Sequence, residues 1–203
     1  MGLKKQKVAK SGQQSLTPAD NKKLLKHITT KKNWNQLVID RSIKLQLNHL
    51  TNLIPQLNIH GKSIEVKNDA ESGYKVLFAG PTKGKKLAAK LIGKQNSLDV
   101  YRIDISRLVP NYNGETEKNL EKIFDAAEAK NWILFFDEAD ALFGKRTDVK
   151  DSHDRYANNE ISYLLQKIKK YPGLIIFSSK NVEDNNHTFP IHFNTIIHFK
   201  KPS

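Results

Sequence analysis

The chain has 203 residues, of which 38% are hydrophobic, and it carries a formal net charge of +13. This size fits one ordinary soluble domain, and no apolar run approaches the roughly 20 residues of a membrane-spanning helix. The lack of cysteine excludes disulfides and thiolate-bound metals. Because the N-terminus also lacks the apolar segment of a signal peptide, we expect a cytoplasmic protein.

The positive charge is concentrated in residues 1–33, which hold nine lysines against the single acid Asp20. We expect about the first fifteen residues to be disordered, because such a composition buries too little apolar surface to offset the entropy of ordering. Solubility, docking on an acidic partner and salt-sensitive nucleic-acid binding are the roles open to this tail. Nucleic-acid binding is the least favoured, because the tail has no interleaved aromatic residues and no recognised nucleic-acid motif.

Two helices are predicted before the first strand. Thr17 and Pro18 are typical of a helix start, and they predict a short basic helix that runs through Ile28. Asp40 can cap a second helix, which ends at Pro55. Its apolar face is formed by residues at helical spacing, namely Ile43, Leu47, Leu50 and Ile54.

Short apolar strands alternate with helices from Lys75 onward, after a polar, turn-rich loop at 61–73. Such alternation predicts an α/β fold whose mostly parallel, five-stranded sheet is covered by helices on both faces. Ligands of such sheets bind at the carboxyl edge. The predicted strands are 76–79, 100–103, 133–136, 174–178 and 195–199, and the predicted helices are 85–94, 115–130 and 155–170.

A candidate phosphate loop lies between the first of these strands and the helix after it. A working loop of this kind reads G-x-x-x-x-G-K-[ST], wraps phosphates with backbone N–H groups and places its lysine on the outer phosphates. Here three residues separate Gly80 from Gly84 instead of four, so the loop is one amide short. The candidate nucleotide-binding residues are Gly80, Pro81, Thr82, Lys83, Gly84, Lys85 and Lys86.

Lys86 stands where this pattern requires a serine or threonine that ligates Mg²⁺. An ammonium group cannot coordinate a metal, and its charge repels a divalent cation by several kcal/mol at an effective dielectric of about 20. We therefore expect metal-dependent binding to be impaired. Two interpretations stay open, which are plain decay of the loop and metal-free anion binding by Lys83, Lys85 and Lys86.

Residues 132–138 describe a buried strand that ends in two acids, Asp137 and Glu138. In phosphate-loop NTPases a strand-end aspartate holds Mg²⁺. Taken with the loop at 80–86, this strand indicates a nucleotide site, with an ordinary surface strand end as the alternative.

Several motifs together resemble the AAA+ ATPases, among them GETEKNL at 114–120 and FFDEADALFGKR at 135–146. They are most similar to the bacterial members encoded beside phage-tail-like contractile injection systems. The resemblance implies a three-layer P-loop NTPase-type core, preceded by a helical N-terminal segment, that assembles into rings with ATP at the subunit interfaces. It divides the chain into a basic tail (1–33), disordered to partly helical, an N-terminal helix and linker (34–73) and the large α/β subdomain (74–203).

The resemblance also implies roles for individual residues. Asp137 would hold Mg²⁺, often through water, and Glu138 would activate the attacking water as the general base. Tyr112 falls where such rings place a substrate-gripping aromatic residue in the central pore, although Asn113 replaces its usual apolar neighbour. A plain loop tyrosine is the alternative at that position.

The chain departs from the family in its catalytic parts. Ser178, Ser179 and Lys180 stand where the family has Ala-Thr-Asn, and residues 189–194 contain none of the arginines that act as its arginine fingers. The sequence also stops at Ser203, before the family's helical lid.

From these departures we expect a degenerate member, a pseudo-ATPase, with weakened binding of ATP or ADP and impaired binding of Mg²⁺. Its partners would be proteins, such as an active AAA+ paralogue or injection-system components, in a homo- or hetero-oligomer. An active ATPase with a variant phosphate loop is one alternative, and a basic scaffold or nucleic-acid-binding protein is another.

Overall fold

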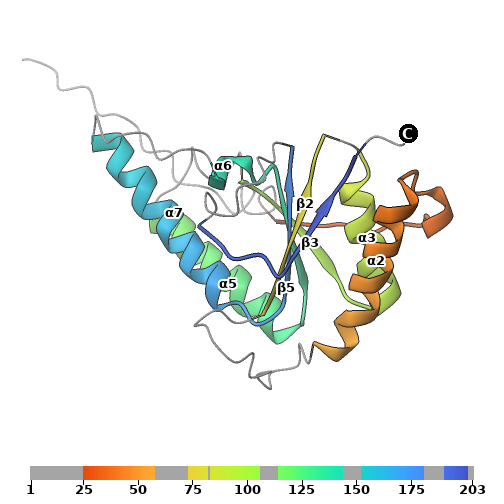
Figure 1. Cartoon of the computed structure of the whole chain (residues 1–203). Helices are drawn as coiled ribbons and strands as arrows, with labels where there is room; N and C mark the ends of the chain where they lie inside the picture. Colours follow the sequence, from red (N-terminus) through yellow and green to blue (C-terminus); the bar gives the residue numbers. More distant parts are fainter. Residues whose placement is uncertain are drawn as a thin grey trace, which may run out of the picture.

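The computed structural model describes residues 25–57, 73–81, 83–105, 114–143, 152–180 and 190–200. These residues form a six-stranded sheet in the order β1-β3-β4-β5-β2-β6 (Figure 1). All neighbouring strands are parallel except β1, which runs antiparallel to β3. The strands are β1 (Leu25–His27), β2 (Tyr74–Ala79), β3 (Val100–Asp104), β4 (Ile133–Asp137), β5 (Leu174–Ser179) and β6 (Thr195–His198). The predicted α/β fold is confirmed, with one strand more than expected.

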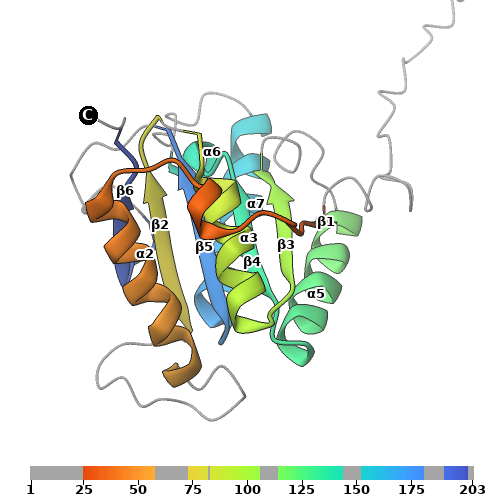
Figure 2. The same ribbon diagram turned by 90° about the vertical axis from the view of Figure 1, so that its right-hand side faces the viewer.

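Helices cover both faces of this sheet and make a three-layer core, as predicted. Helices α2 and α3 lie on one face, and α5 and α7 lie on the other (Figure 1 and Figure 2). The helices and helical turns are α2 (Arg41–Leu53), α3 (Lys85–Asn96), α5 (Gly114–Ala129), α6 (Asp140–Phe143), α7 (Ser152–Lys170), η1 (Trp34–Gln36) and η2 (Ile54–Gln56).

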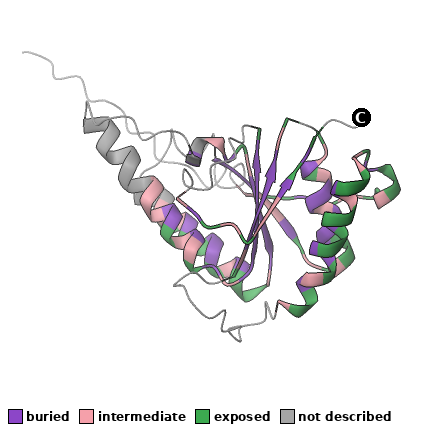
Figure 3. Cartoon of the chain, in the orientation of Figure 1, coloured by how far each residue is buried: buried purple, intermediate pink, exposed green. Residues whose placement is uncertain are grey.

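The strands between the two helical layers are largely buried (Figure 3). Because successive side chains of a strand point to opposite faces, each face receives its own apolar cluster. Under α5 and α7, Phe136 stacks on Phe177 with 5.3 Å between the ring centroids. Under α2 and α3, the ring centroids of Phe78 and Phe199 are 5.0 Å apart. This packing holds the strands in place, and it thereby sets the position of the residues that follow each strand.

Helix α2 begins where the sequence predicts. The Asp40 Oδ1 atom accepts a hydrogen bond of 2.7 Å from the Ser42 backbone N–H, so Asp40 is the cap of this helix. The predicted apolar face packs on the sheet in the same cluster as Phe78. Its members, Ile43, Leu47, Leu50 and Ile54, are all buried.

The predicted basic helix is wrong for its last residues, because Leu25–His27 form strand β1. Leu25 pairs with Ile103 and packs against the cluster under α5 and α7, and the His27 ring stacks on Tyr101 at 4.9 Å. The edge of β3 offers a row of backbone hydrogen-bonding groups. Pairing with that edge outweighs the weak helix preference of a short basic segment. Such a long-range pairing leaves no local signal in the sequence.

Some predictions fall outside the described residues. They concern the tail at 1–24, including the helix start at Thr17, most of the loop at 61–73, and Tyr112. Within the parts of the chain that are described, no helix has the length and apolar character needed to cross a membrane.

Candidate functional site

Four strands deliver polar groups to the carboxyl edge of the sheet. Strand β2 leads into the loop that begins at Gly80, while β3 ends in Asp104, β4 in Asp137 and β5 in Ser179. The register aligns these ends, because Asp104 lies opposite Asp137 and Ala79 lies opposite Ser179. Residues from four distant parts of the sequence therefore meet at one edge, which is where parallel sheets bind ligands.

The two glycines of the candidate phosphate loop both have backbone conformations that favour glycine. Gly80 has a φ of 111°, and a Cβ atom there would lie 2.5 Å from the Phe199 carbonyl oxygen. Gly84 has a φ of 131° and is the N-cap of α3. Both ends of the described loop therefore have a backbone that L-residues with a Cβ rarely adopt. Thr82 lies outside the described residues.

Lys85 reaches back across this loop. Its buried ammonium group donates a hydrogen bond to the Gly80 carbonyl oxygen and another, of 2.7 Å, to the Ser179 carbonyl oxygen. Burial lowers the pKa of Lys85, and the charges of Asp140 and Asp137 offset this only in part. The residue predicted to bind the outer phosphates thus already has two carbonyl acceptors, and a phosphate would have to compete with them.

Asp137 accepts hydrogen bonds from two cations on one oxygen. Both Lys86 Nζ and Arg102 Nε lie 2.7 Å from its Oδ2 atom. Arg102 Nη2 also donates to Asp104 Oδ2 at 2.9 Å. Burial alone would raise the pKa of Asp137, but the hydrogen bonds and charges of Lys86 and Arg102 hold that pKa below its ordinary value. At neutral pH this carboxylate is therefore ionised and engaged by side chains of its own chain.

The second acid, Glu138, is in a looser environment. Its Oε1 atom lies 3.8 Å from Lys180 Nζ, and both side chains are exposed. Its backbone is in the left-handed region, with a φ of 56°. Just beyond it, Asp140 accepts 2.6 Å and 3.1 Å hydrogen bonds from Ser179 Oγ and from the Lys180 backbone N–H. The turn after β4 is thereby fastened to the end of β5.

These residues do not fit a bound Mg²⁺. Magnesium requires oxygen ligands in a nearly octahedral arrangement, usually one or two carboxylates with waters and phosphates. The hydroxyl ligand expected after Lys85 is replaced by Lys86, whose ammonium group lies on the carboxylate that would bind the metal. Among the described residues, no group of three histidine, aspartate or glutamate side chains is arranged to hold a metal ion. A divalent cation at the Oδ2 atom of Asp137 would therefore meet the Lys86 and Arg102 side chains, which both lie 2.7 Å from that atom.

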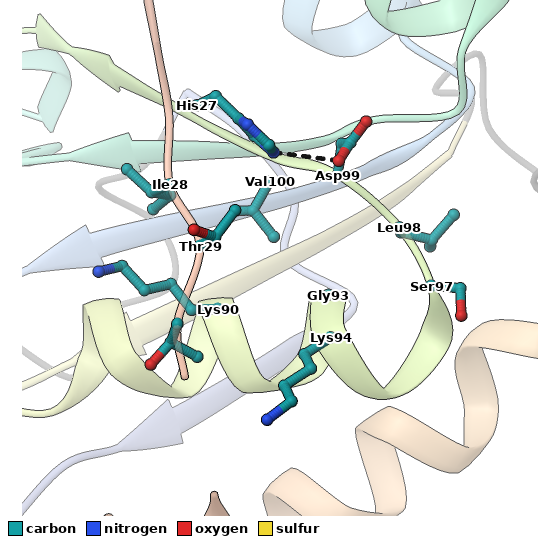
Figure 4. A pocket seen from close by; sticks show the side chains of 11 residues that line it. His27, Ile28, Thr29, Lys90, Gly93, Lys94, Ser97, Leu98, Asp99 and Val100 are labelled. Atoms are coloured by element: carbon teal, nitrogen blue, oxygen red, sulfur yellow. Dashed lines mark hydrogen bonds and ion pairs between the residues drawn. The ribbon is translucent and has the colours of Figure 1, made fainter. Parts of the chain in front are cut away.

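A cavity of about 320 Å³ lies at the other end of β3, between α3 and the segment that follows β1 (Figure 4). His27 Nε2 lies 3.0 Å from Asp99 Oδ1 on its rim. Lys94 Nζ donates to the Lys32 carbonyl oxygen at 3.1 Å and to Asn33 Oδ1 at 3.0 Å. These contacts fasten the N-terminal segment to the core, and the cavity is separate from the acid pair at the carboxyl edge.

No role was predicted for Arg102 or Asp140, although both are central to the edge. One signal for Arg102 was available, because Arg102 and Asp104 are two residues apart on a strand and so share a face. Asp140 and Ser179 have no such signal, because they meet only through the pairing of β4 with β5.

Comparisons with known proteins agree on one family. The family model described as "ATPase family associated with various cellular activities (AAA)" matches residues 76–200. An uncharacterised AAA family ATPase, y4kL, of Sinorhizobium fredii is 38% identical over 81 residues, which are 39% of this chain and 24% of that protein. The peroxisomal ATPase PEX6 of Dictyostelium discoideum is 41% identical over 78 residues, 38% of this chain and 6% of that protein. The proteasome-activating nucleotidase 1 of Haloferax volcanii is 33% identical over 105 residues, 51% of this chain and 26% of that protein.

The chain thus spans about a quarter or less of the length of these relatives. The predicted likeness to injection-system ATPases is not matched among them, since two are named for the peroxisome and the proteasome. Among solved structures, the AAA domain of FIGL-1 in complex with ADP aligns with a TM-score of 0.56 and 18% identity. The alignment covers 88% of this chain and 59% of that one, and it shows a shared fold.

Proposed function

The chain belongs to the AAA family of ATPases, and we propose that it is a pseudo-ATPase, a member without nucleotide turnover that acts by contact with other protein subunits. One observation carries this proposal. Both Lys86 and Arg102 lie 2.7 Å from the Oδ2 atom of Asp137, the residue expected to hold Mg²⁺. ATPases with a phosphate loop rely on a divalent cation to neutralise the phosphate charge. In this chain the carboxylate expected to hold that cation is bound by two side-chain cations instead.

The other catalytic positions support the same conclusion. A general base must accept a hydrogen bond from the attacking water. Here the ammonium group of Lys180 lies 3.8 Å from Glu138 and competes for that carboxylate. The family has a neutral asparagine side chain at the position of Lys180. Residues 189–194 contain no arginine, and an arginine finger contributes roughly 10³ to 10⁵ in rate to the GTPases where it is best measured. Each of these changes alone would slow hydrolysis, and together they favour its loss.

The described part of the α/β core, in contrast, is well packed, and this favours a role in binding other proteins. Five strands of the sheet are parallel and the core is buried, so surfaces that contact neighbouring subunits can be presented without catalysis. The partner that fits best is an AAA subunit with a complete phosphate loop, which this chain would join in a mixed ring. Attachment to a contractile injection apparatus is supported only by the sequence resemblance.

The second candidate function is genuine ATP hydrolysis with a variant loop. One observation favours it, which is that Asp137, the last residue of β4, and Glu138, which follows it, lie at the same sheet edge as the loop at Gly80 and Gly84, with β5 between β4 and β2. On this alternative, ATP and Mg²⁺ would displace Lys86 from Asp137 on binding. Only turnover measurements separate the two functions.

The test is phosphate release from ATP and Mg²⁺ by the full chain, with Glu138→Gln as the matched control. We expect the wild type and Glu138→Gln to release phosphate equally slowly, at the rate of a blank. When an active AAA subunit is added, we expect the chain to join the ring of that subunit, as measured by light scattering. The wild type and Glu138→Gln should then change the rate of phosphate release by the active subunit equally. Phosphate release by the wild type that disappears in Glu138→Gln would overturn the proposal.

A further inference from the structure

Among the described residues, four cations and four acids are linked by contacts or charge interactions at the carboxyl edge, and the formal charges of these eight cancel. Without Lys86 and Lys180 the same set would carry two negative charges, which is the charge that one divalent cation neutralises. These eight described side chains thus balance one another in charge. The cations are Lys85, Lys86, Arg102 and Lys180, and the acids are Asp104, Asp137, Glu138 and Asp140.

The strongest part of this balance joins three elements through one carboxylate. Lys86 comes from the first turn of α3, Arg102 from β3, and Asp137 from the end of β4. The Asp137 side chain is only 14% exposed, against 22% for Arg102 and 46% for Lys86. Hydrogen bonds between ionised groups are the strong ones, and salt screens partly buried pairs less than exposed pairs. The contact is therefore suited to holding the edge in place.

The geometry matches the task of a metal in a phosphate loop. In a working loop, the hydroxyl after the lysine and the strand-end aspartate are joined through Mg²⁺. Here the residue after Lys85 contacts the strand-end aspartate directly, through the Lys86 ammonium group. Arg102 adds a second bond from the neighbouring strand and also engages Asp104.

Lys180 contributes differently. Its ammonium group lies 3.8 Å from Glu138, with 71% of the Lys180 side chain exposed. Exposed pairs of this kind stabilise little. Lys180 therefore contributes to the balance of charge, whereas Lys86 and Arg102 hold the Asp137 side chain in place.

We propose that Lys86 and Arg102 are a resident substitute for the divalent cation, holding Asp137 and the first turn of α3 together without metal and excluding a divalent cation from Asp137. This inference deepens the proposed function and rests on it, since a site with this substitute has no use for metal-dependent turnover. It goes further, because it assigns Lys86 and Arg102 a positioning role at Asp137 rather than treating the phosphate loop as merely decayed.

The first test uses Mn²⁺ as the probe, without nucleotide, on the ¹⁵N-labelled full chain. Bound Mn²⁺ broadens the amide signals of nearby residues even when it binds weakly. We expect no selective broadening at Asp137 in the wild type. In Lys86→Thr, which restores a hydroxyl, we expect selective broadening there and an apparent affinity at least about tenfold higher.

The matched control is Lys83→Thr, which removes the same charge from an exposed position of the same loop. If general charge repulsion excluded the metal, Lys83→Thr and Lys86→Thr would gain affinity alike, and the proposal would be overturned. Lys86→Gln is a second variant that keeps a hydrogen-bond donor near Asp137 and so guards against misfolding. Selective broadening in the wild type, or its absence in both Lys86 variants, would also overturn the proposal.

Hydrogen exchange then tests the positioning role. The first α3 amide with a hydrogen bond inside the helix is that of Ala88, which donates to the Gly84 carbonyl oxygen. We expect exchange of the α3 amides from Ala88 onward to be slow in the wild type with a chelator, several-fold faster in Lys86→Thr, and slowed again in that variant by Mn²⁺. An unchanged exchange rate in Lys86→Thr would contradict the role. These readouts involve no ATP, so phosphate release by the wild type would overturn the proposed function independently of their outcome.

Discussion

The interior of the sheet and its carboxyl edge are held together by different forces, although they adjoin within one strand. Phe136 is fully buried and stacks on Phe177, whereas the next residue, Asp137, is partly buried and binds two cations. Burial of apolar area is not directional and tolerates many sequences of similar volume. Charge-assisted hydrogen bonds depend on both partners being present. A chain can therefore keep its family's fold while a few substitutions at the edge change the chemistry.

The largest expected effect belongs to the interior. Phe136→Ala should lower the free energy of unfolding by about 3–5 kcal/mol, because it removes a buried ring and leaves a cavity beside Phe177. Phe136→Leu, which retains most of the volume, should cost much less, about 1–2 kcal/mol. Urea denaturation followed by circular dichroism measures both. A loss below about 1 kcal/mol in Phe136→Ala would show that packing does not govern the interior.

The next effect lies at the boundary of the two regions. Gly80→Ala should cost roughly 2–3 kcal/mol, because its Cβ would lie 2.5 Å from the Phe199 carbonyl oxygen in addition to the strain of a positive φ. Gly84→Ala carries a similar strain, but the nearest atom to its Cβ is a side-chain carbon at 3.3 Å, so we expect about 1 kcal/mol. Thermal unfolding of the two variants compares them directly. Equal losses would mean that the contact with Phe199 does not shape the loop.

A smaller effect measures the edge itself. A double-mutant cycle with Lys86→Met and Asp137→Asn should give a coupling of about 0.5–1 kcal/mol, since Lys86 is half exposed. The coupling should shrink in about 1 M salt. Lys83→Met paired with Asp137→Asn is the matched cycle, and it should give a coupling near zero. If both cycles gave the same value, the Lys86 contact would not be specific.

The smallest expected effect is a dependence on pH. Lys86 and Arg102 hold the folded-state pKa of Asp137 below its ordinary value of 3.8. The stability from this carboxylate is thus fully present above that ordinary value and is lost as the pH falls through the folded-state pKa. Between about pH 5 and pH 2, the wild type should therefore lose stability more steeply than Asp137→Asn. Parallel losses in acid titrations of the two proteins would contradict this assignment.

The two regions also differed in how far the sequence predicted them. The strand expected at 133–136 is observed as Ile133–Asp137. A short, continuous apolar run is typical of a strand that is buried on both faces in a parallel sheet. Strand β1 was missed, because its pairing with β3 depends on residues far away in the sequence. Lys86 and Asp137 were each identified from a motif, but their contact was not, because a motif carries no information on which side chains will touch. The spacing of Arg102 and Asp104 on one strand indicated a shared face, but the contact of Arg102 with Asp137 depends on the pairing of β3 with β4.

The central claim is that side chains of this chain occupy the position of the divalent cation at Asp137. The most direct test is a crystal of the full chain grown with ATP and Mn²⁺, in which anomalous scattering locates the metal. Our account predicts no manganese peak at coordination distance from Asp137 and an intact hydrogen bond between Lys86 Nζ and Asp137 Oδ2. A manganese ion bound to Asp137, with Lys86 displaced onto the phosphates, would contradict it.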